Sequence, residues 1–274
     1  MFEIDHIIRN ALQEDIGLGD VTTLATVDAQ TQSRAELVAK EDFILSGIDV
    51  CGRVFSLLDS SVAFEKLKED GQAVRRGEVL AWLRGSASIL LQGERVALNL
   101  LQRMSGIATQ TSLFVKAVEG TKATIVDTRK TTPGLRVLEK YSVRMGGGRN
   151  HRTSLYDGVL IKENHVAAAG GIETAVRRAR ERVPHTLKIE VETRNLEEVN
   201  EALAAGADIL LLDNMSLREL RESVALIGGR ALCEASGGVN LDTVRDIAET
   251  GVDLISVGAL THSSRAVDIS MLFQ

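Results

Sequence analysis

Six short runs of β-branched and other apolar residues recur through the second half of the chain, and they limit its fold more than any other feature. The runs are 124–127, 158–162, 187–192, 208–213, 232–236 and 253–258. Their first residues lie 34, 29, 21, 24 and 21 positions apart, which leaves room for one strand, one helix and two loops in each unit. Continuous apolar runs, unlike alternating ones, are typical of strands buried on both faces of a parallel sheet.

Amphipathic segments lie between these runs. Residues 172–183 and 196–205 place apolar side chains at helical spacing, and Gly206 follows the second segment where a helix would end. The repeated pattern is compatible with a (β/α) barrel or an open doubly wound sheet. We favour the barrel, because five of the six runs end in polar or small residues and barrel strands converge on one ligand-binding face. Six runs rather than eight leave either an incomplete barrel or strands that the pattern does not reveal.

The first 110 residues do not follow this rhythm. Their patterns predict helices and short strands at 2–15 (helix), 36–39 and 43–45 (strands), 49–58 (helix), 62–67 with 79–83 (hairpin) and 89–120 (one or two helices). We therefore predict the α/β class, with a smaller α+β domain at residues 1–110 followed by a barrel domain at 111–264.

Composition excludes several classes of function. The net charge is −6 and aromatic residues make up 3% of the chain, so binding to nucleic acid or to an anionic membrane is not expected. Cys51 and Cys233 lie far apart, which argues against a disulfide framework or a zinc site. No apolar stretch approaches the ~20 residues of a membrane span, and the N-terminal residues are too charged for a signal peptide. We expect a cytoplasmic protein.

One stretch of the chain is strongly basic. Seven basic residues and a single acidic residue lie between Arg129 and Arg152. Such a run can be a solvated cationic helix face. We favour an anion-binding site, because both ends of the stretch look like loops, three consecutive glycines permit close approach of a ligand, and both arginines lie near strand ends.

Two carboxylates close successive runs of the barrel pattern. Glu192 and Asp213 should lie side by side at one rim, where hard oxygen ligands suit Mg²⁺ and carboxylates can also bind the hydroxyl groups of a ribose. The alternative is a pair of helix N-caps, which is a better explanation for Asp213 than for Glu192, because glutamate caps poorly.

Glycine-rich strand ends form a third feature. They precede expected helices in the last two units, a common place for phosphate in barrels. The residues are Ser236, Gly237 and Gly238 in one unit and Val257, Gly258 and Ala259 in the other.

With these residues assembled, the chain resembles the quinolinate phosphoribosyltransferase family, also called carboxylating nicotinate-nucleotide pyrophosphorylase. The resemblance runs nearly from end to end. It rests on EDIGLGDVTT (14–23), GERVALNLLQRMSGIAT (93–109), DTRKTTPGLR (127–136), GGGRNHR (146–152), DGVLIKENH (157–165), LLLDN (210–214), EASGG (234–238) and SVGALTHS (256–263).

The resemblance implies a fold and a set of site residues. The fold is an incomplete (β/α) barrel preceded by a smaller α+β sandwich domain, with the tail at about 265–274 packed on the latter. The quinolinate-binding residues would be Arg95, Arg129, His151, Arg152 and Lys162. Lys130, Glu192 and Asp213 would contact phosphoribosyl pyrophosphate and its Mg²⁺ as catalytic residues, and the two glycine-rich strand ends would hold the 5′-phosphate.

The implied reaction joins quinolinate to a phosphoribosyl group and releases pyrophosphate and carbon dioxide, with Mg²⁺ and no organic cofactor. The implied assembly is a homodimer, or a multiple of dimers, in which Arg95 acts in the partner's site. A related phosphoribosyltransferase with another acceptor is the first alternative, although Arg95, Arg129, Arg152 and Lys162 together suit a dianion. The second alternative, a non-catalytic nucleotide-sensing module, would not need Lys130, Glu192 and Asp213.

Overall fold

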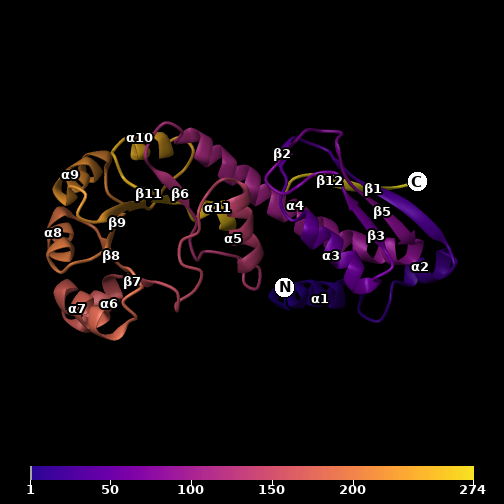
Figure 1. The fold of residues 1–274 in the computed structure, drawn as a ribbon, viewed down its shortest axis with the longest axis horizontal. Coiled ribbons are helices and arrows are strands. Elements are labelled where there is room, and N and C mark those ends of the chain that lie inside the picture. The colour runs from indigo at the N-terminus through magenta and orange to yellow at the C-terminus, as the bar shows by residue number, and fades with distance from the viewer. Residues whose placement is uncertain (1) are drawn as a thin grey trace. The chain divides into compact units, whose positions relative to one another are not determined.

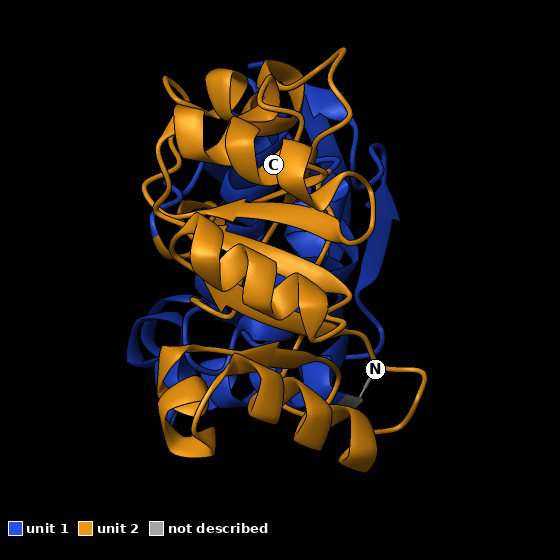
Figure 2. Cartoon of the chain, turned by 90° about the vertical axis from the view of Figure 1, so that its left-hand side faces the viewer, with its two compact units in different colours: residues 1–112, 131–147, 263–274 blue, residues 113–130, 148–262 orange. Residues whose placement is uncertain are grey.

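The computed structural model describes residues 2–274 and divides the chain into two compact units (Figures 1 and 2). Unit 1 contains the residues up to Ser112 together with 131–147 and 263–274. Unit 2 contains 113–130 and 148–262.

Unit 2 is built on a six-stranded parallel sheet with the strand order β6-β11-β10-β9-β8-β7. The strands are β6 (Thr124–Val126), β7 (Val159–Ile161), β8 (Ile189–Thr193), β9 (Ile209–Asp213), β10 (Leu232–Ser236) and β11 (Leu254–Ser256). Each of the six predicted runs overlaps one of them, and β8 extends one residue beyond its run. Strands β6 and β7 form the two edges, and no ladder joins them among residues 2–274. The predicted incomplete barrel is therefore confirmed.

Helices follow the strands along the outside of the curved sheet, where α7, α8 and α9 lie side by side (Figure 1). The helices of this unit are α6 (Glu163–Ala169), α7 (Ile172–Arg182), α8 (Leu196–Ala204), α9 (Leu217–Ile227), α10 (Val244–Ala248) and α11 (Ala259–His262). Side chains along the strands are buried, as in Val191, Leu210 and Leu212, because helices cover one face and the barrel interior the other.

Unit 1 is an antiparallel sheet of order β12-β1-β5-β3 with helices packed on it. Its strands are β1 (Gln32–Ala39), β3 (Ala63–Lys66), β5 (Val79–Ser86) and β12 (Ile269–Phe273), with a separate pair formed by β2 (Phe43–Ile44) and β4 (Ala73–Val74). Its helices are α1 (Phe2–Ile16), α2 (Val21–Thr26), α3 (Ile48–Leu58), α5 (Arg136–Met145) and most of α4 (Ala87–Ala117). The C-terminal segment supplies β12, which pairs with β1.

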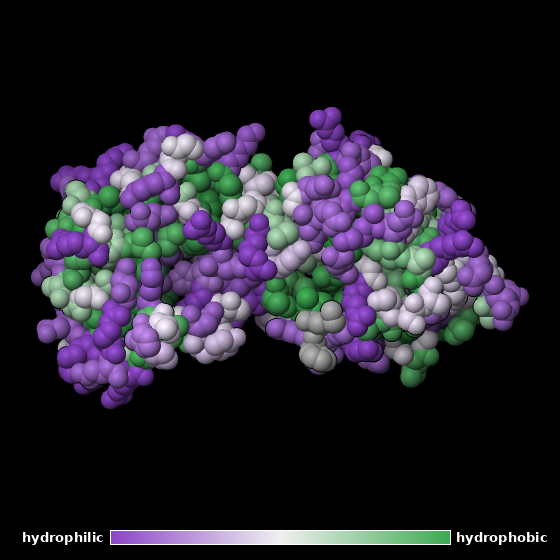
Figure 3. Space-filling model, viewed as in Figure 1, coloured by the Kyte–Doolittle hydropathy of each residue, from purple (hydrophilic) through white to green (hydrophobic). Residues whose placement is uncertain are grey.

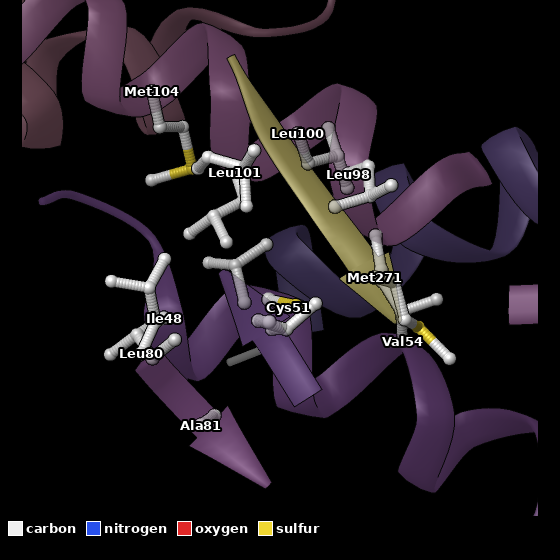
Figure 4. Close-up of a cluster of buried hydrophobic side chains, with 14 of the residues drawn as sticks. Ile48, Cys51, Val54, Leu80, Ala81, Leu98, Leu100, Leu101, Met104 and Met271 are labelled. Atoms are coloured by element: carbon white, nitrogen blue, oxygen red, sulfur yellow. The ribbon is translucent and has the colours of Figure 1, made fainter. Parts of the chain in front are cut away.

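One apolar core holds unit 1 together. Figure 4 shows Ile48, Cys51 and Val54 of α3 facing side chains of α4, among them Leu101 and Met104. Burying each side chain of this size contributes roughly 1.5–3 kcal/mol. Cys51 is free and buried, and burial raises the pKa of its thiol, so it acts as a small apolar residue.

The division of the chain differs in one respect from the expected continuous barrel domain at 111–264. Residues 131–147, which include α5, belong to unit 1. Leu138 joins its core, and the Tyr141 hydroxyl donates a 2.7 Å hydrogen bond to Asp70. The middle of the basic stretch is therefore a helix of unit 1, whereas Arg129 and Arg152 belong to unit 2.

Candidate functional site

A cleft of about 630 Å³ opens at the carboxyl ends of the unit 2 strands. It is lined by Thr128, Arg129, Lys130, His151, Arg152, Leu160, Lys162, Glu192, Leu211, Asp213, Asn214, Glu234, Ser236, Gly237, Gly238 and Ser256. The predicted convergence of strand ends thus brings residues from five loops into one cavity. All of its lining residues belong to unit 2.

Four cationic side chains line this cleft. Arg129 and Lys130 follow β6, Arg152 comes from the loop between α5 and β7, and Lys162 follows β7. Burial, followed by the nearby charge of Arg129, lowers the pKa of Arg152. Two guanidinium groups that repel each other are stabilised when an anion binds between them, so this part of the cleft is suited to an anionic ligand.

Carboxylates form another wall of the cleft. Strands β8 and β9 pair in parallel, with Glu192 opposite Leu211, and both Glu192 and Asp213 line the cavity. Lys162 Nζ lies 2.7 Å from Glu192 Oε2, so a predicted quinolinate contact and a predicted Mg²⁺ contact form an ion pair here. The cationic and anionic parts of the site are therefore in direct contact.

The helix-cap explanation for these carboxylates is wrong. The side chain of Asn195 caps α8 by accepting the Glu198 N–H at 2.9 Å. Ser216 caps α9 and forms a capping box with Glu219. Glu192 and Asp213 each lie three residues before the capping residue, so their carboxylates are not used in capping.

The turn after β10 brings glycine backbone to the cleft. Gly237 has φ +95°, and a Cβ there would lie 2.2 Å from Asn214 Oδ1, so only glycine fits. Asn214 itself has φ +54° and donates from Nδ2 to Asp213 Oδ2 at 2.8 Å. The predicted phosphate-binding residues Ser236, Gly237 and Gly238 all line the cleft.

The second glycine-rich strand end lies beside this cleft without lining it. Val257, Gly258 and Ala259 connect β11 to α11. A Cβ on Gly258 would lie 3.1 Å from the Cδ of Lys130, a residue that does line the cleft. Their contact with phosphate stays a prediction.

His151 is tied into the barrel interior. Its Nε2 lies 2.8 Å from Glu190 Oε2, and its Nδ1 accepts the backbone N–H of Arg152 at 2.8 Å. Since Nδ1 is an acceptor, the ring hydrogen belongs on Nε2 and points to Glu190. Glu234 Oε2 lies 3.9 Å from the same ring nitrogen, Nε2.

The ligand atoms of His151, Glu190 and Glu234 lie within 4.8 Å of one another, a spacing that would suit a metal ion. To bind a metal ion, Nε2 would have to lose its hydrogen. In a neutral ring that hydrogen would move to Nδ1, which already accepts the N–H of Arg152, so the change is disfavoured. We therefore regard the three residues as a hydrogen-bonded cluster.

Arg95 lies elsewhere in the chain, on α4 of unit 1, where its side chain is exposed. Its predicted contact with quinolinate in a partner's site stays a prediction. Six lining residues of the cleft were not predicted, namely Thr128, Leu160, Leu211, Asn214, Glu234 and Ser256, and neither was Glu190, which contacts His151. All six stand inside the quoted motifs and could have been included, whereas Glu190 lies within a strand and outside those motifs.

Comparison with known proteins agrees with this arrangement. The family model described as quinolinate phosphoribosyl transferase, C-terminal domain, matches residues 107–272, and the one for the N-terminal domain matches residues 20–105. A probable nicotinate-nucleotide pyrophosphorylase [carboxylating] of Bacillus subtilis is 46% identical over 269 residues, which cover 98% of this chain and 93% of the relative. A chloroplastic nicotinate-nucleotide pyrophosphorylase [carboxylating] of Arabidopsis thaliana is 43% identical over 98% of this chain and 82% of its own length.

Solved structures give the same result. The crystal structure of NadC from Streptococcus pyogenes has a TM-score of 0.96 and 42% identity, covering 100% of this chain and 97% of that one. The nicotinate-nucleotide pyrophosphorylase from Ehrlichia chaffeensis has a TM-score of 0.94 and 42% identity over 98% of both chains. With both family domains matched and relatives this similar along nearly its whole length, the chain belongs to the quinolinate phosphoribosyltransferase family.

Proposed function

We propose that this enzyme transfers a phosphoribosyl group from phosphoribosyl pyrophosphate to quinolinate, giving nicotinate mononucleotide, pyrophosphate and carbon dioxide, a step of de novo NAD biosynthesis. The observation that carries the proposal is the cleft, in which four cations and two strand-end carboxylates meet next to a glycine turn. Both substrates are polyanions, and a cationic cavity removes the repulsion between them and orients them for reaction.

Quinolinate is assigned to the cationic part of the cleft. Arg129, Arg152 and Lys162 would bind its two carboxylates, and the repulsion between the two arginines supports an anion at this place. Lys162 is paired with Glu192 in the ligand-free protein, so it would exchange that partner for a substrate carboxylate. The contact of His151 would be limited, since both ring nitrogens are engaged within the protein.

Phosphoribosyl pyrophosphate is assigned to the other part of the cleft. Lys130 would bind the pyrophosphate, and Ser236, Gly237 and Gly238 would bind the 5′-phosphate through backbone N–H groups, with Val257, Gly258 and Ala259 nearby. Glu192 and Asp213 fit Mg²⁺, because they are oxygen donors on paired strands and neither is used as a helix cap. When bound, Mg²⁺ would neutralise the charge on the pyrophosphate.

The reaction then needs two bond changes. The ring nitrogen forms a bond to the anomeric carbon as the bond to pyrophosphate breaks, and carboxylate groups near the ribose stabilise positive charge that develops there. The nitrogen becomes a pyridinium, which stabilises the electron pair left on the ring carbon when the adjacent carboxylate departs as carbon dioxide. That carbon takes up a proton. The ring itself accepts the electrons, so no organic cofactor is required.

The assembly belongs to the proposal as well. We expect a homodimer, or a multiple of dimers, with Arg95 reaching the site of the partner subunit. Leu18, Val21 and Leu24 in unit 1 and Tyr156 in unit 2 are more than 70% exposed, and apolar patches interrupt the hydrophilic surface in Figure 3. Exposed apolar groups of this size support contact with a second copy of the chain.

We also keep the cytoplasm as the proposed location, which the acidic composition and two free, buried cysteines support. No helix within residues 2–274 is long and apolar enough to span a membrane.

The choice of acceptor can be tested by comparing kcat/KM for quinolinate and nicotinate. Nicotinate lacks the second carboxylate and would leave cationic groups of the cleft without a partner, so we expect its kcat/KM to be lower by a factor on the order of 10⁴. Similar values for both acids would favour the alternative phosphoribosyltransferase with another acceptor. A protein that binds both substrates without turnover would favour the sensing module.

A further inference from the structure

The loop that carries Arg152 crosses the open edge of the barrel. It runs from the end of α5 to β7 and bridges to β6 on the way, so it lies between the two edge strands of the sheet. Arg149 begins the crossing by bridging to Val126, with its N–H donating to Ile125 O at 2.9 Å. Arg152 ends it, with its guanidinium donating to Gly158 O at 3.1 Å.

Packing alone does not hold this loop. A cavity of about 340 Å³ lies beneath it and is lined by both loop and strand residues, including His151, Arg152 and Glu190. Side chains beside such a void make fewer close contacts than those in a filled core. The position of the loop therefore depends on its hydrogen bonds.

Two buried carboxylates, those of Asp127 and Glu190, form these hydrogen bonds with the loop. Asp127, which is fully buried at the end of β6, accepts the backbone N–H of His151 at 2.8 Å and the side-chain amide of Asn150 at 2.6 Å. Glu190 on β8 is 4% exposed and bonds the His151 ring at 2.8 Å. The other ring nitrogen holds the N–H of Arg152. A continuous path thus runs from the interior carboxylate through one imidazole to the backbone of a cleft arginine.

We propose that Glu190 is a positioning residue that acts through His151 to place Arg152 for quinolinate binding. Glu190 does not line the cleft and reaches it only through the ring. Its burial beside Glu234 is unfavourable for folding, because two neighbouring buried carboxylates repel each other and Glu190 Oε1 has no hydrogen-bond partner among residues 2–274. An apolar residue in β8 would avoid that repulsion but could not accept the ring hydrogen of His151, so the carboxylate is accounted for by its hold on the His151–Arg152 segment. This inference rests on the proposed function.

The test uses variants that keep or remove the acceptor at position 190. Glu190→Gln can still accept the ring hydrogen through its amide oxygen, whereas Glu190→Leu and Glu190→Met cannot. We expect Glu190→Leu and Glu190→Met to lower kcat/KM for quinolinate by about 10- to 100-fold, mainly by raising KM. Small misplacement of a binding group has effects of this order. In these variants KM for phosphoribosyl pyrophosphate should stay within about twofold of wild type. Glu190→Gln should retain most of the wild-type kcat/KM for quinolinate.

Two further measurements separate positioning from loss of structure. Calorimetric titration with quinolinate should show the same loss of affinity without turnover. The unfolding temperatures of the Glu190→Leu and Glu190→Met variants should change little, because removal of a repelling charge offsets the lost hydrogen bond from His151. In a double-mutant cycle, Glu190→Leu with His151→Ala should be no worse than the poorer single variant, since both act on one path.

Three results would overturn the inference. The first is a normal KM for quinolinate in the Leu and Met variants. The second is full additivity in the cycle, which would mean that His151 acts without Glu190. The third is a fall in unfolding temperature that accompanies the loss of affinity in both variants. If the wild-type protein shows no quinolinate turnover, the proposed function fails. If the wild-type protein is active and Glu190→Leu is equally active, only the inference about Glu190 fails.

Discussion

Replacing Glu234 by glutamine should stabilise the protein at neutral and alkaline pH. Glu234 on β10 is 1% exposed. Burial, and then the charge of Glu190, raise its pKa to about 7. The Ser256 hydroxyl donates to Ala235 O at 3.4 Å, and neither carboxyl oxygen of Glu234 has a hydrogen-bond partner among residues 2–274. The folded protein therefore holds a proton that the unfolded chain releases.

The sign and size of the effect follow from linkage. In the unfolded chain this carboxyl ionises near pH ~4.3, so stability falls as the pH rises from there to about 7 and is level above it. The two pKa values differ by an amount equivalent to roughly 4 kcal/mol. Glutamine cannot ionise, and its amide can donate toward Glu190 Oε1, which has no hydrogen-bond partner. For a domain of this size the gain corresponds to roughly 5–10 °C in unfolding temperature above pH 7.

The assay is thermal unfolding followed by circular dichroism from pH 5 to pH 9. The difference between Glu234→Gln and wild type should be small at pH 5 and largest at pH 8 and above. Glu222→Gln, on the exposed pair with Arg218, is the control and should show no such trend. A constant difference across the pH range, or a less stable variant at pH 8, would refute the reasoning, because Glu234 would then be ionised and favourably paired.

Three other predictions follow from the site. Asp213→Asn should reduce activity by a factor on the order of 10² or more with an unchanged unfolding temperature, whereas Ser216→Ala should lose about 1 kcal/mol of stability and keep its kinetics. The reverse pattern would mean that Asp213 contributes to stability and not to the reaction. Arg95→Ala and Asp213→Ala, each nearly inactive alone, should regain roughly a quarter of wild-type activity when refolded together, because half of the dimers are mixed and each mixed dimer has one intact site. No recovery in mixed dimers confirmed by mass would mean that Arg95 serves its own chain. Gly237→Ala should raise KM for phosphoribosyl pyrophosphate, since its Cβ would meet Asn214 Oδ1 at 2.2 Å, and a normal KM would exclude this turn from the site.

The fold was largely predictable because the strands of unit 2 have a local sequence signature. Buried parallel strands need continuous apolar runs, so all six strands of unit 2 fell within or beside the predicted segments. The strand order, with β6 beside β11, was not predictable, because it depends on closure of the sheet. The return of 131–147 to unit 1 was missed for a similar reason, since Leu138 joins a core formed by residues distant in sequence.

The site residues that could be predicted are those whose residue type is unusual at their position in the sequence pattern. Glu192 and Asp213 end apolar strands, and Arg129 and Arg152 stand in a basic loop of an acidic chain. Glu190 was missed because it lies inside a strand, among apolar residues and outside the quoted motifs, whereas Glu234 opens the quoted EASGG motif and could have been included. The engagement of both ring nitrogens of His151 was also beyond prediction, since Glu190 is 39 residues away.

The central claim is tested most directly by incubating the pure protein with phosphoribosyl pyrophosphate, Mg²⁺ and quinolinate labelled in the carboxylate next to the ring nitrogen. The account predicts that nicotinate mononucleotide, pyrophosphate and labelled carbon dioxide form in equal amounts, and that none forms after EDTA treatment until Mg²⁺ is restored. Pyrophosphate release without labelled carbon dioxide, or no consumption of quinolinate, would contradict it.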